Sequence, residues 1–377
     1  MESPTSENLM KKVLHYKTNY LNPSETFIDR LVRNHRDWTA AALCYRKREF
    51  CDGLTIFEVP DSGLSALINT ASFHLNQPLP FYRNIVFDLK PDLIHAHFGF
   101  DGYKLIKIAK DSGIPLIVSF YGSDVSRLPT EFNWKRRYRK LAKSASHFIA
   151  ASGFMKSQLI ALGFPEDSIS IIRFGLDLEK HRFDGENRPP LRLILAGRLV
   201  EKKGFEFALR AIAASRNHGH NWKANLYGDG PLLESLKNLT KELGLNGSVQ
   251  FHGFQPVETI LDALRSHTLM LAPSVTASDG DMEGFPNTIL EAMAAGTPVI
   301  TTRHAAIPEA IIHEKSGFLA DEGDTKELGL ILDRIANGEI NLNKIRRNAR
   351  KIIEDQYSID NIVHNVERVY DRVISDG

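Results

Sequence analysis

The sequence predicts an α/β protein made of two Rossmann-like domains, each with a parallel sheet covered by helices. Short apolar runs alternate with longer helical patterns along most of the chain, which is typical of βαβ units. The chain has 377 residues, enough for two such domains. A polar break at residues 183–190 interrupts the alternation, which then restarts. We therefore expect an N-terminal domain over residues 1–187 and a second domain from residue 188.

The apolar runs predict the strands of both sheets. Strands of the first domain are expected at residues 12–16, 39–45, 54–59, 93–97, 116–120, 147–151 and 170–174. Strands of the second are expected at residues 191–196, 224–227, 249–251, 268–271, 299–301 and 318–319. From about Asp324 the chain reads as two or three helices. Ligands of open α/β sheets bind beyond the carboxyl ends of the strands. We therefore expect the active-site residues in loops that follow strands. With two such domains, the active site should lie in a cleft between them.

Composition excludes several classes of protein. Apolar and charged fractions of 42% and 25% are those of an ordinary globular protein, and a net charge of +1 argues against general nucleic-acid binding. The two cysteines, Cys44 and Cys51, form no CxxC pair and fit a reducing cytoplasm. The N-terminal residues lack the apolar core of a signal peptide, and no run reaches the ~18 apolar residues of a spanning helix. We expect a cytoplasmic protein, at most peripheral to a membrane.

The most informative segment is residues 273–301, where a strand is followed by an acidic loop, a helix and a second strand. Pro286 suits the first position of the helix, so the amides of Asn287 and Thr288 are expected at the positive end of its dipole, an anion site. Glu283 precedes the helix, and Glu291, one turn in, leans back toward its N-terminus. A phosphate site between two carboxylates suits a nucleotide sugar.

A second anion-binding element follows strand 191–196. Arg198 and Lys203 lie in the strand-to-helix turn that ends at Gly204, and a helix is expected from about Phe205. Side chains of this type can clamp a diphosphate, whereas the alternative is a solvated basic turn.

The pattern Glu-x7-Glu followed by Ala-Met-Ala-x-Gly-x-Pro resembles the donor-site signature of family 4 retaining glycosyltransferases, which have the GT-B fold. The resemblance implies that Glu283 contacts the donor sugar and that Arg198 and Lys203 bind its diphosphate. It also implies a donor domain over residues 188–357 and a last helix, residues 358–377, that crosses back to the acceptor domain. It also implies a set of donor-binding residues: Gly284, Phe285, Pro286, Asn287, Thr288 and Glu291, with the backbone of Gly253 and Phe254 beside the base.

The acceptor side is less explicit. The segments around Glu25, around residues 278–284 and around residues 304–309 are similar to the colanic acid and amylovoran subgroup of the family. His97, Tyr121 and Asp124 follow strands and should face the cleft. Many relatives carry His where this chain has Tyr121, whose phenol is a poor base at neutral pH. For His97, a buried structural histidine and a functional one are equally compatible with the sequence.

No metal or other cofactor is expected. Asp279-Gly-Asp281 mimics a metal-binding Asp-x-Asp motif, but Arg198, Lys203 and the helix N-terminus already supply positive potential, so we interpret both as loop acids. Residues 132–143 form a basic amphipathic helix that either lies on anionic lipid or packs Trp134 and Tyr138 inward.

These patterns predict an enzyme that moves a hexose from a UDP- or GDP-sugar, with retention, onto a lipid-linked or polysaccharide acceptor in bacterial exopolysaccharide synthesis. The alternatives are a nucleotide-sugar epimerase or phosphorylase on the same fold, and a non-catalytic subunit that binds a nucleotide sugar.

Overall fold

The structure is a computed structural model that describes residues 10–20, 25–48, 52–74, 79–183 and 191–376. It divides into two compact units. The N-terminal unit comprises the chain up to Ala151, Met155–Gly175 and the residues from Ile359, and the C-terminal unit comprises Ser152–Phe154 and Leu176–Ser358. The final helix, α13 (Ile359–Ser375), therefore belongs to the N-terminal unit.

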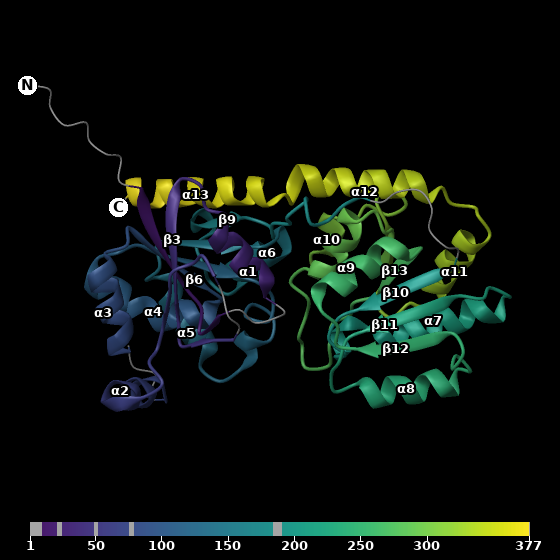
Figure 1. The fold of residues 1–377 in the computed structure, drawn as a ribbon, viewed down its shortest axis with the longest axis horizontal. Helices are drawn as coiled ribbons and strands as arrows, with labels where there is room; N and C mark the ends of the chain where they lie inside the picture. The colour runs from purple at the N-terminus through teal and green to yellow at the C-terminus, as the bar shows by residue number, and fades with distance from the viewer. Residues whose placement is uncertain (1–9, 21–24, 49–51, 75–78, 184–190, 377) are drawn as a thin grey trace, which may run out of the picture. The chain divides into compact units, whose positions relative to one another are not determined.

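The described part of the N-terminal unit is built on a parallel sheet with the strand order β5-β3-β1-β6-β7-β8-β9 (Figure 1). Its strands are β1 (Lys11–Tyr16), β3 (Trp38–Cys44), β5 (Ile56–Glu58), β6 (Leu93–His97), β7 (Leu116–Phe120), β8 (His147–Ala150) and β9 (Ile169–Ile171). A separate pair joins β2 (Asn19–Tyr20) to β4 (Arg46–Lys47).

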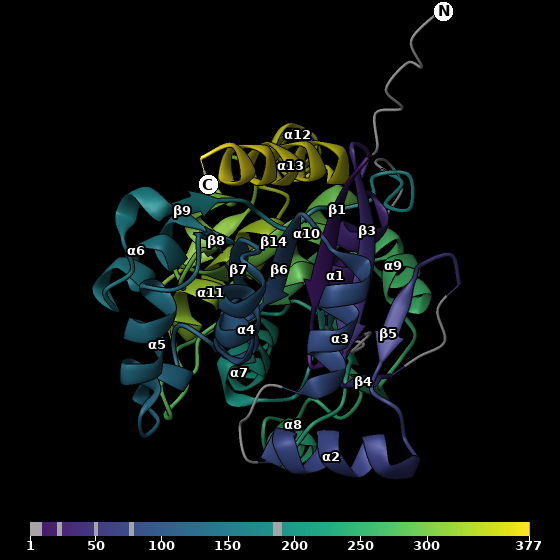
Figure 2. The same ribbon diagram turned by 90° about the vertical axis from the view of Figure 1, so that its left-hand side faces the viewer.

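Helices cover both faces of this sheet. One face packs against α13, whose buried Val363, Val366 and Tyr370 meet Val13 of β1 and Leu93 of β6. The opposite face carries α4, as Figure 2 shows. The helices of the unit, besides α13, are α1 (Thr26–Arg33), α2 (Gly63–His74), α3 (Pro80–Leu89), α4 (Gly99–Ser112), α5 (Trp134–Ala142) and α6 (Gly153–Ala161), with 3-10 turns at Leu128–Thr130 and Glu166–Ser168.

The C-terminal unit has a second parallel sheet, with the order β12-β11-β10-β13-β14-β15. Its strands are β10 (Arg192–Ala196), β11 (Lys223–Tyr227), β12 (Val249–Gly253), β13 (Leu269–Ala272), β14 (Val299–Thr302) and β15 (Phe318–Ala320). Its helices are α7 (Phe205–Asn217), α8 (Leu233–Glu242), α9 (Val257–Ser266), α10 (Asn287–Ala294), α11 (Thr325–Ala336) and α12 (Leu342–Gln356), with 3-10 turns at Glu201–Lys203 and Ile307–Glu309. Leu193 and Leu226 of the sheet pack on Leu209 of α7 and Leu332 of α11, which forms the main core.

Every strand expected from the apolar runs is present, most within two residues of the expected bounds. The predicted strand at 170–174 is shifted, because β9 ends at Ile171. The two-residue strands β2 and β4 were not predicted, since such short pairs leave no periodic signal. The tail after Asp324 forms three helices. Most of the polar break, including the expected boundary at residue 187, lies outside the described residues.

Candidate active site

The acidic loop of the C-terminal unit leads from β13 into α10. Helix α10 begins at Asn287 with Pro286 as its N-cap, one residue later than the sequence predicted. The proline provides no capping side chain, and the amides of Asn287 and Thr288 have no carbonyl within the helix to which they can donate. Gly284, Phe285 and Pro286 are buried, so the loop that presents these amides is packed into the unit.

Glu283 is buried just before this helix, with 8% of its surface exposed. Its Oε2 lies 3.2 Å from Nζ of Lys203, and its Oε1 lies 3.7 Å from Nζ of Lys202. Burial by itself raises the pKa of the Glu283 carboxyl, but the two ammonium groups and the nearby His304 outweigh burial, and the pKa lies below its usual value. Glu283 is therefore a carboxylate held between two cations.

A tight backbone approach fixes the two lysines beside Glu283. Gly204, which ends the turn Glu201–Lys203, has a φ of +64°, and a Cβ there would lie 1.8 Å from the carbonyl oxygen of Pro273. Only glycine fits this position. In addition, the amide of Val275 donates to the carbonyl of Lys202 at 2.9 Å, so the lysine turn and the acidic loop are joined directly.

A second clamp, which the sequence did not predict, holds the backbone of Glu283. Its amide donates to Nε2 of His304 at 3.1 Å, and Nδ1 of His304 lies 2.6 Å from Oε1 of Glu322. Because Nε2 accepts, the proton of the neutral ring is on Nδ1 and points to Glu322. The amide of Thr276 donates to the other oxygen of Glu322 at 2.7 Å. The sequence signals were that His304 follows a strand and that it begins the segment 304–309, which is similar to the colanic acid and amylovoran subgroup.

The remaining donor-side residues are more dispersed. Glu291 is buried on α10 and not on a solvated face. Arg198 is exposed in the loop after β10. Gly253 closes β12 with a φ of +68°, and the side chain of Phe254 is 69% exposed. An exposed aromatic ring after a strand is available for stacking.

The Asp-x-Asp motif is engaged by protein groups. Oδ2 of Asp281 lies 3.0 Å from Nζ of Lys202, so a cation of the chain already faces it. The Oδ1 of Asp279 accepts a hydrogen bond from the amide of Asp281 at 2.9 Å, which stabilises the loop. Both residues therefore have partners within the loop and its neighbouring lysine turn.

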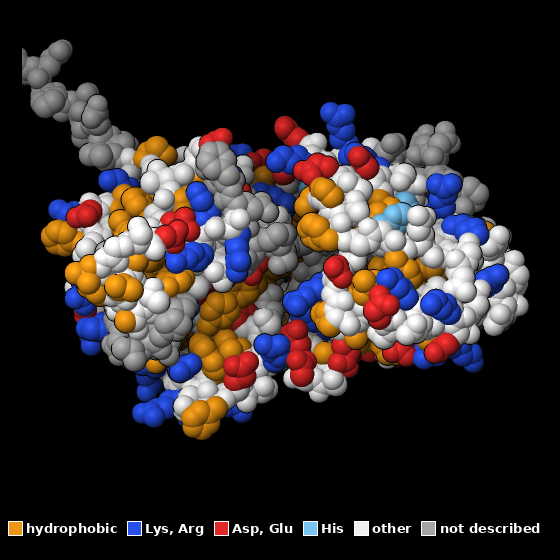
Figure 3. Space-filling view, turned by 60° about the horizontal axis from the view of Figure 1, so that its bottom comes forward, with side chains coloured by type: hydrophobic (Ala, Val, Ile, Leu, Met, Phe, Trp, Pro, Cys, Tyr) orange, Lys and Arg blue, Asp and Glu red, His pale blue; other side chains and the backbone are white. Residues whose placement is uncertain are grey.

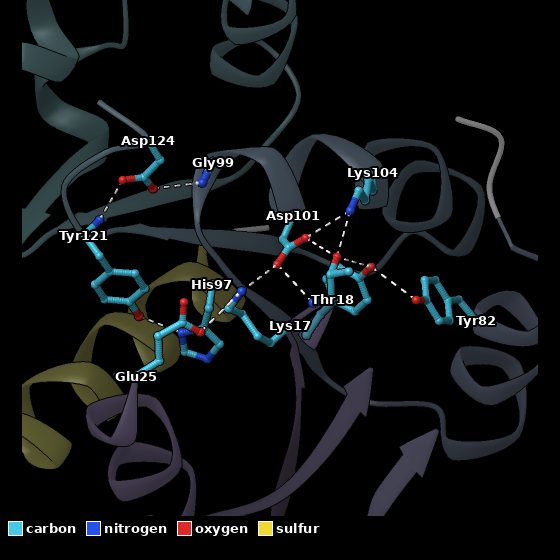
Figure 4. Close-up of polar contacts among 11 residues, drawn as sticks. Lys17, Thr18, Glu25, Tyr82, His97, Gly99, Asp101, Lys104, Tyr121 and Asp124 are labelled. Atoms are coloured by element: carbon cyan, nitrogen blue, oxygen red, sulfur yellow. Dashed lines mark hydrogen bonds and ion pairs between the residues drawn. The ribbon is translucent and has the colours of Figure 1, made fainter. Parts of the chain in front are cut away.

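In the N-terminal unit, His97 and Tyr121 lie together. The Tyr121 hydroxyl lies 2.6 Å from Nδ1 of His97 (Figure 4). His97 is fully buried at the end of β6 and also contacts His15 of β1 at 2.9 Å. Burial raises the pKa of Tyr121 well above its usual value, which reinforces the expectation that this phenol is a poor base. His97 is thus a buried histidine whose two ring nitrogens both have hydrogen-bond partners, and one of these partners is the half-buried Tyr121.

Asp124 and Glu25 have different surroundings from those expected of two acids facing an open cleft. Asp124 is buried and accepts hydrogen bonds from the amides of Gly99, Tyr121 and Gly122 at 3.1, 3.1 and 2.9 Å. Its carboxyl therefore anchors the loop. Glu25 lies 3.5 Å from Nζ of Lys17 (Figure 4).

Lys17, the residue after β1, was not singled out by the sequence. Its side chain is 5% exposed and lies between Glu25 and the buried Asp101, 3.6 Å from the latter. The ammonium also lies 4.6 Å from the ring centre of Phe98, a cation–π contact. A lysine directly after the first strand was the signal that could have identified it.

The basic helix, α5, packs its apolar stripe inward. Tyr138 and Leu141 are buried, while Phe132, just before the helix, is 90% exposed. Exposed hydrophobic side chains also occur on α2 and α3, and Figure 3 shows hydrophobic side chains gathered over the N-terminal unit. The largest of those on the two helices are Leu64, Leu67, Ile68 and Phe87.

Comparison with known proteins identifies the family. Residues 177–352 match the model of glycosyl transferases group 1, and residues 62–180 match that of glycosyltransferase family 4. The amylovoran biosynthesis glycosyltransferase AmsK of Erwinia amylovora is 35% identical over 71% of this chain and 67% of its own length. The chain belongs to glycosyltransferase family 4. WcaL of Escherichia coli, named for colanic acid biosynthesis, is 30% identical over 71% of this chain and 68% of its own length.

Solved structures agree on the fold of this family 4 glycosyltransferase. The structure of Anabaena HepE in complex with UDP superimposes with a TM-score of 0.77 at 20% identity, covering 96% of this chain and all of that one. Together with the two parallel sheets, this likeness confirms the predicted GT-B fold. AmsK and WcaL are both named as glycosyltransferases, which supports the enzyme reading over the epimerase, phosphorylase and non-catalytic alternatives. In the described residues of this glycosyltransferase, no helix combines the length and the apolar character needed to cross a bilayer.

Proposed function

We propose that this glycosyltransferase moves a hexose from a UDP- or GDP-sugar, with retention, to a lipid-linked or polysaccharide acceptor in bacterial exopolysaccharide synthesis. The C-terminal unit binds the donor and the N-terminal unit binds the acceptor. The observation that carries the proposal is the buried Glu283 carboxylate, held between Lys202 and Lys203 directly before the N-terminus of α10.

Each group has a role in this reaction. Lys203, the exposed Arg198 and the amides of Asn287 and Thr288 stabilise the charge that develops on the departing diphosphate. Glu283 hydrogen-bonds hydroxyls of the donor sugar and opposes the positive charge of the ring. When the diphosphate binds, Lys203 turns from Glu283 to the phosphate, and Lys202 remains beside the carboxylate.

No protein nucleophile or metal is part of the proposal. As the family resemblance implies, the acceptor hydroxyl attacks from the face that the diphosphate leaves, and the departing phosphate takes the hydroxyl proton. The carboxylate of Glu283 is surrounded by cations, so it is suited to electrostatic stabilisation and poorly suited to attack the sugar. HepE is described with UDP and with UDP-glucose, which supports a uridine donor as the first to test.

The substitution Glu283→Gln tests the donor assignment. We expect kcat to fall by at least about 100-fold, because the amide cannot oppose the charge of the sugar ring. Binding of the free nucleoside diphosphate should stay within about threefold of wild type or become tighter, since UDP and GDP carry no sugar and Lys203 is released. Transfer kinetics and calorimetry measure the two effects, and the anomeric configuration of the product, read by NMR, tests retention.

Asp281→Asn is the matched control, since Asp281 pairs with the same Lys202 but lies outside the proposed sugar contact. It should lower kcat by less than about fivefold. A Glu283→Gln enzyme whose kcat stays within tenfold of wild type would contradict the role of Glu283.

We also propose that the N-terminal unit contacts anionic lipid through Phe132 and the basic face of α5, which would bring it to a lipid-linked acceptor. Lys135, Arg136 and Arg139 are exposed there, and the inward packing of Tyr138 leaves them directed to solvent.

Flotation with vesicles tests this contact. The protein should float with phosphatidylglycerol vesicles and not with phosphatidylcholine alone, and 0.5 M salt or the triple change Lys135→Glu, Arg136→Glu, Arg139→Glu should abolish flotation. Charge reversal on α8, at Lys237 and Lys241, is the control and should have no effect. Equal flotation with both lipids would exclude an electrostatic contact.

A further inference from the structure

Four histidines of the N-terminal unit form a buried group beneath α13. His15 lies on β1, His95 and His97 lie on β6, and His35 follows α1. His15, His95 and His97 are at most 1% exposed, and the side chain of His35 is 2% exposed. The hydrogen bonds of this group lead to Tyr121.

One branch of these bonds connects Tyr121 to Glu367 of α13. Nδ1 of His97 lies 2.6 Å from the Tyr121 hydroxyl (Figure 4), and Nε2 of His97 lies 2.9 Å from Nδ1 of His15. Nε2 of His15 lies 3.0 Å from Nε2 of His35, and Nδ1 of His35 lies 3.0 Å from Oε1 of Glu367. Four consecutive hydrogen bonds therefore join the two residues.

A second branch connects Ser119, two residues before Tyr121, to the same helix one turn later. The hydroxyl of Tyr370 lies 2.5 Å from Nδ1 of His95, and Nε2 of His95 lies 2.7 Å from Oγ of Ser119. The first branch therefore reaches the Tyr121 hydroxyl, and the second ends at Ser119 on the neighbouring strand β7.

The carboxylate of Glu367 sets the direction of the first branch. Its Oε1 also accepts the amides of Arg36 and Asp37 at 2.8 and 3.2 Å, and an ionised carboxylate has no proton to donate. Nδ1 of His35 must therefore donate to it. A neutral His35 then accepts at Nε2 from His15, His15 accepts at Nδ1 from His97, and His97 accepts at Nδ1 from the Tyr121 hydroxyl.

A charged His35 would reverse the direction of every bond between it and Tyr121. The same number of hydrogen bonds forms either way, but the reversed chain needs a second buried charge beside the carboxylate. The two backbone amides already stabilise Glu367 without that charge. Burial also lowers the pKa of His15 and of His97, each next to further histidines, so a proton is disfavoured along the chain.

We propose that Glu367, acting through His35, His15 and His97, fixes the Tyr121 hydroxyl as a donor toward the protein, so that Tyr121 meets the substrate only as a hydrogen-bond acceptor. With its proton donated to His97, the oxygen has only lone pairs to offer, and these suit a sugar hydroxyl that donates. Glu367, His35, His15 and His97 are positioning residues. The inference rests on the proposed function, in which the N-terminal unit binds the acceptor, and takes Tyr121 as one of the residues that meet it.

A metal ion is the competing explanation of this cluster. One ligand nitrogen from each of His15, His95 and His97 lies within 4.8 Å of the others. Yet both ring nitrogens of each histidine already have a hydrogen-bond partner among the described residues, and a metal would replace at least two of these bonds. The observed geometry favours the hydrogen-bonded chain.

NMR of the full-length protein labelled with ¹⁵N-histidine tests the direction of the hydrogen bonds between Tyr121 and Glu367, and it needs no substrate. At pH 7.5 we expect His15 and His97 to be neutral and protonated at Nε2, and His35 to be neutral and protonated at Nδ1, with assignments from single histidine variants. A doubly protonated His35 together with an Nδ1-protonated His97 would overturn the proposal. Stoichiometric zinc or nickel in the purified protein would also overturn it.

A double-mutant cycle tests the consequence for transfer. Glu367→Met removes the terminal acceptor and should lower kcat about tenfold with the donor KM within twofold, whereas Glu367→Gln keeps an accepting oxygen and should stay within about threefold of wild type. In a Tyr121→Phe background, Glu367→Met should have no further effect. Asp371→Asn, on the same helix and paired with Lys11, is the control and should match wild type.

Equal losses from Glu367→Met in both backgrounds would show a structural role only and contradict the proposal. Circular dichroism and binding of UDP or GDP confirm that each variant folds. A wild-type protein that transfers no sugar from any donor would refute the proposed function, and in that case the tautomers measured by NMR still decide whether the chain has the proposed direction.

Discussion

Gly204 shows how a single residue determines the geometry of the donor side. The sequence predicted a turn there, with Arg198 and Lys203 as anion ligands and Glu283 as a nearby acid. It did not predict that Lys203 and Glu283 lie 3.2 Å apart, or that His304 and Glu322 clamp the Glu283 backbone. Residue types that follow strands can be recognised from sequence, whereas pairings between separate loops depend on tertiary packing.

The substitution Gly204→Ala should lower the unfolding free energy much more than the same substitution at a glycine with no neighbouring atoms around its Cβ position. The added Cβ would lie 1.8 Å from the Pro273 carbonyl oxygen, so the backbone must move, and we expect a loss of about 3 kcal/mol of unfolding free energy. Gly219→Ala is the control, because its φ of +95° is similarly unfavourable but no atom lies within 4 Å; about 1 kcal/mol is expected. Urea denaturation measures both, and equal losses would contradict the steric argument.

At the scale of elements, strands were predicted well and helix ends less well. Leu93–His97 and Leu116–Phe120 agree with the expected bounds because fully buried parallel strands are continuous apolar runs. The start of α10 was misplaced by one residue, since proline is compatible with both the N-cap and the first helical position. The histidines of β1 and β6 were visible in the sequence, but their partners on α13 lie far along the chain.

The packing of α13 on β1 and β6 predicts acid sensitivity. Burial lowers the pKa of His95 from 6.5 to about 3, and burial also lowers the pKa values of His15 and His97. The unfolded chain therefore binds more protons than the folded one below pH 6.5, and stability falls as the pH falls through this value. Between pH 7.5 and 5.5 each histidine should cost about 1.4 kcal/mol.

Urea denaturation followed by tryptophan fluorescence at both pH values measures this loss, with Trp38 and Trp134 as probes of the N-terminal unit. Burial also lowers the pKa of His147 to about 4, so four histidines contribute, and His95→Gln should reduce the pH dependence by about a quarter. His218→Gln, at an exposed histidine, should leave it unchanged. A stability that is constant or rises between pH 7.5 and 5.5 would show that the buried histidines are charged in the folded protein.

At the scale of the whole molecule, the alternation of strands and helices predicted two α/β units, and the family assignment and the GT-B fold followed from the segment 273–301. The assignment of donor and acceptor roles to the two units is our proposal. The base, the sugar and the acceptor were beyond sequence reasoning, because specificity depends on a few contacts worth about 1–3 kcal/mol each.

Calorimetric titration of the wild type and of Glu291→Ala with UDP and with GDP, in EDTA, tests the central claim most directly. The donor site of the C-terminal unit predicts metal-independent binding of one nucleotide, weakened at least about tenfold (about 1.4 kcal/mol) when the buried Glu291 carboxylate is removed. Binding of neither nucleotide, or binding only after Mn²⁺ or Mg²⁺ is added, would contradict the claim and direct attention to Asp279 and Asp281.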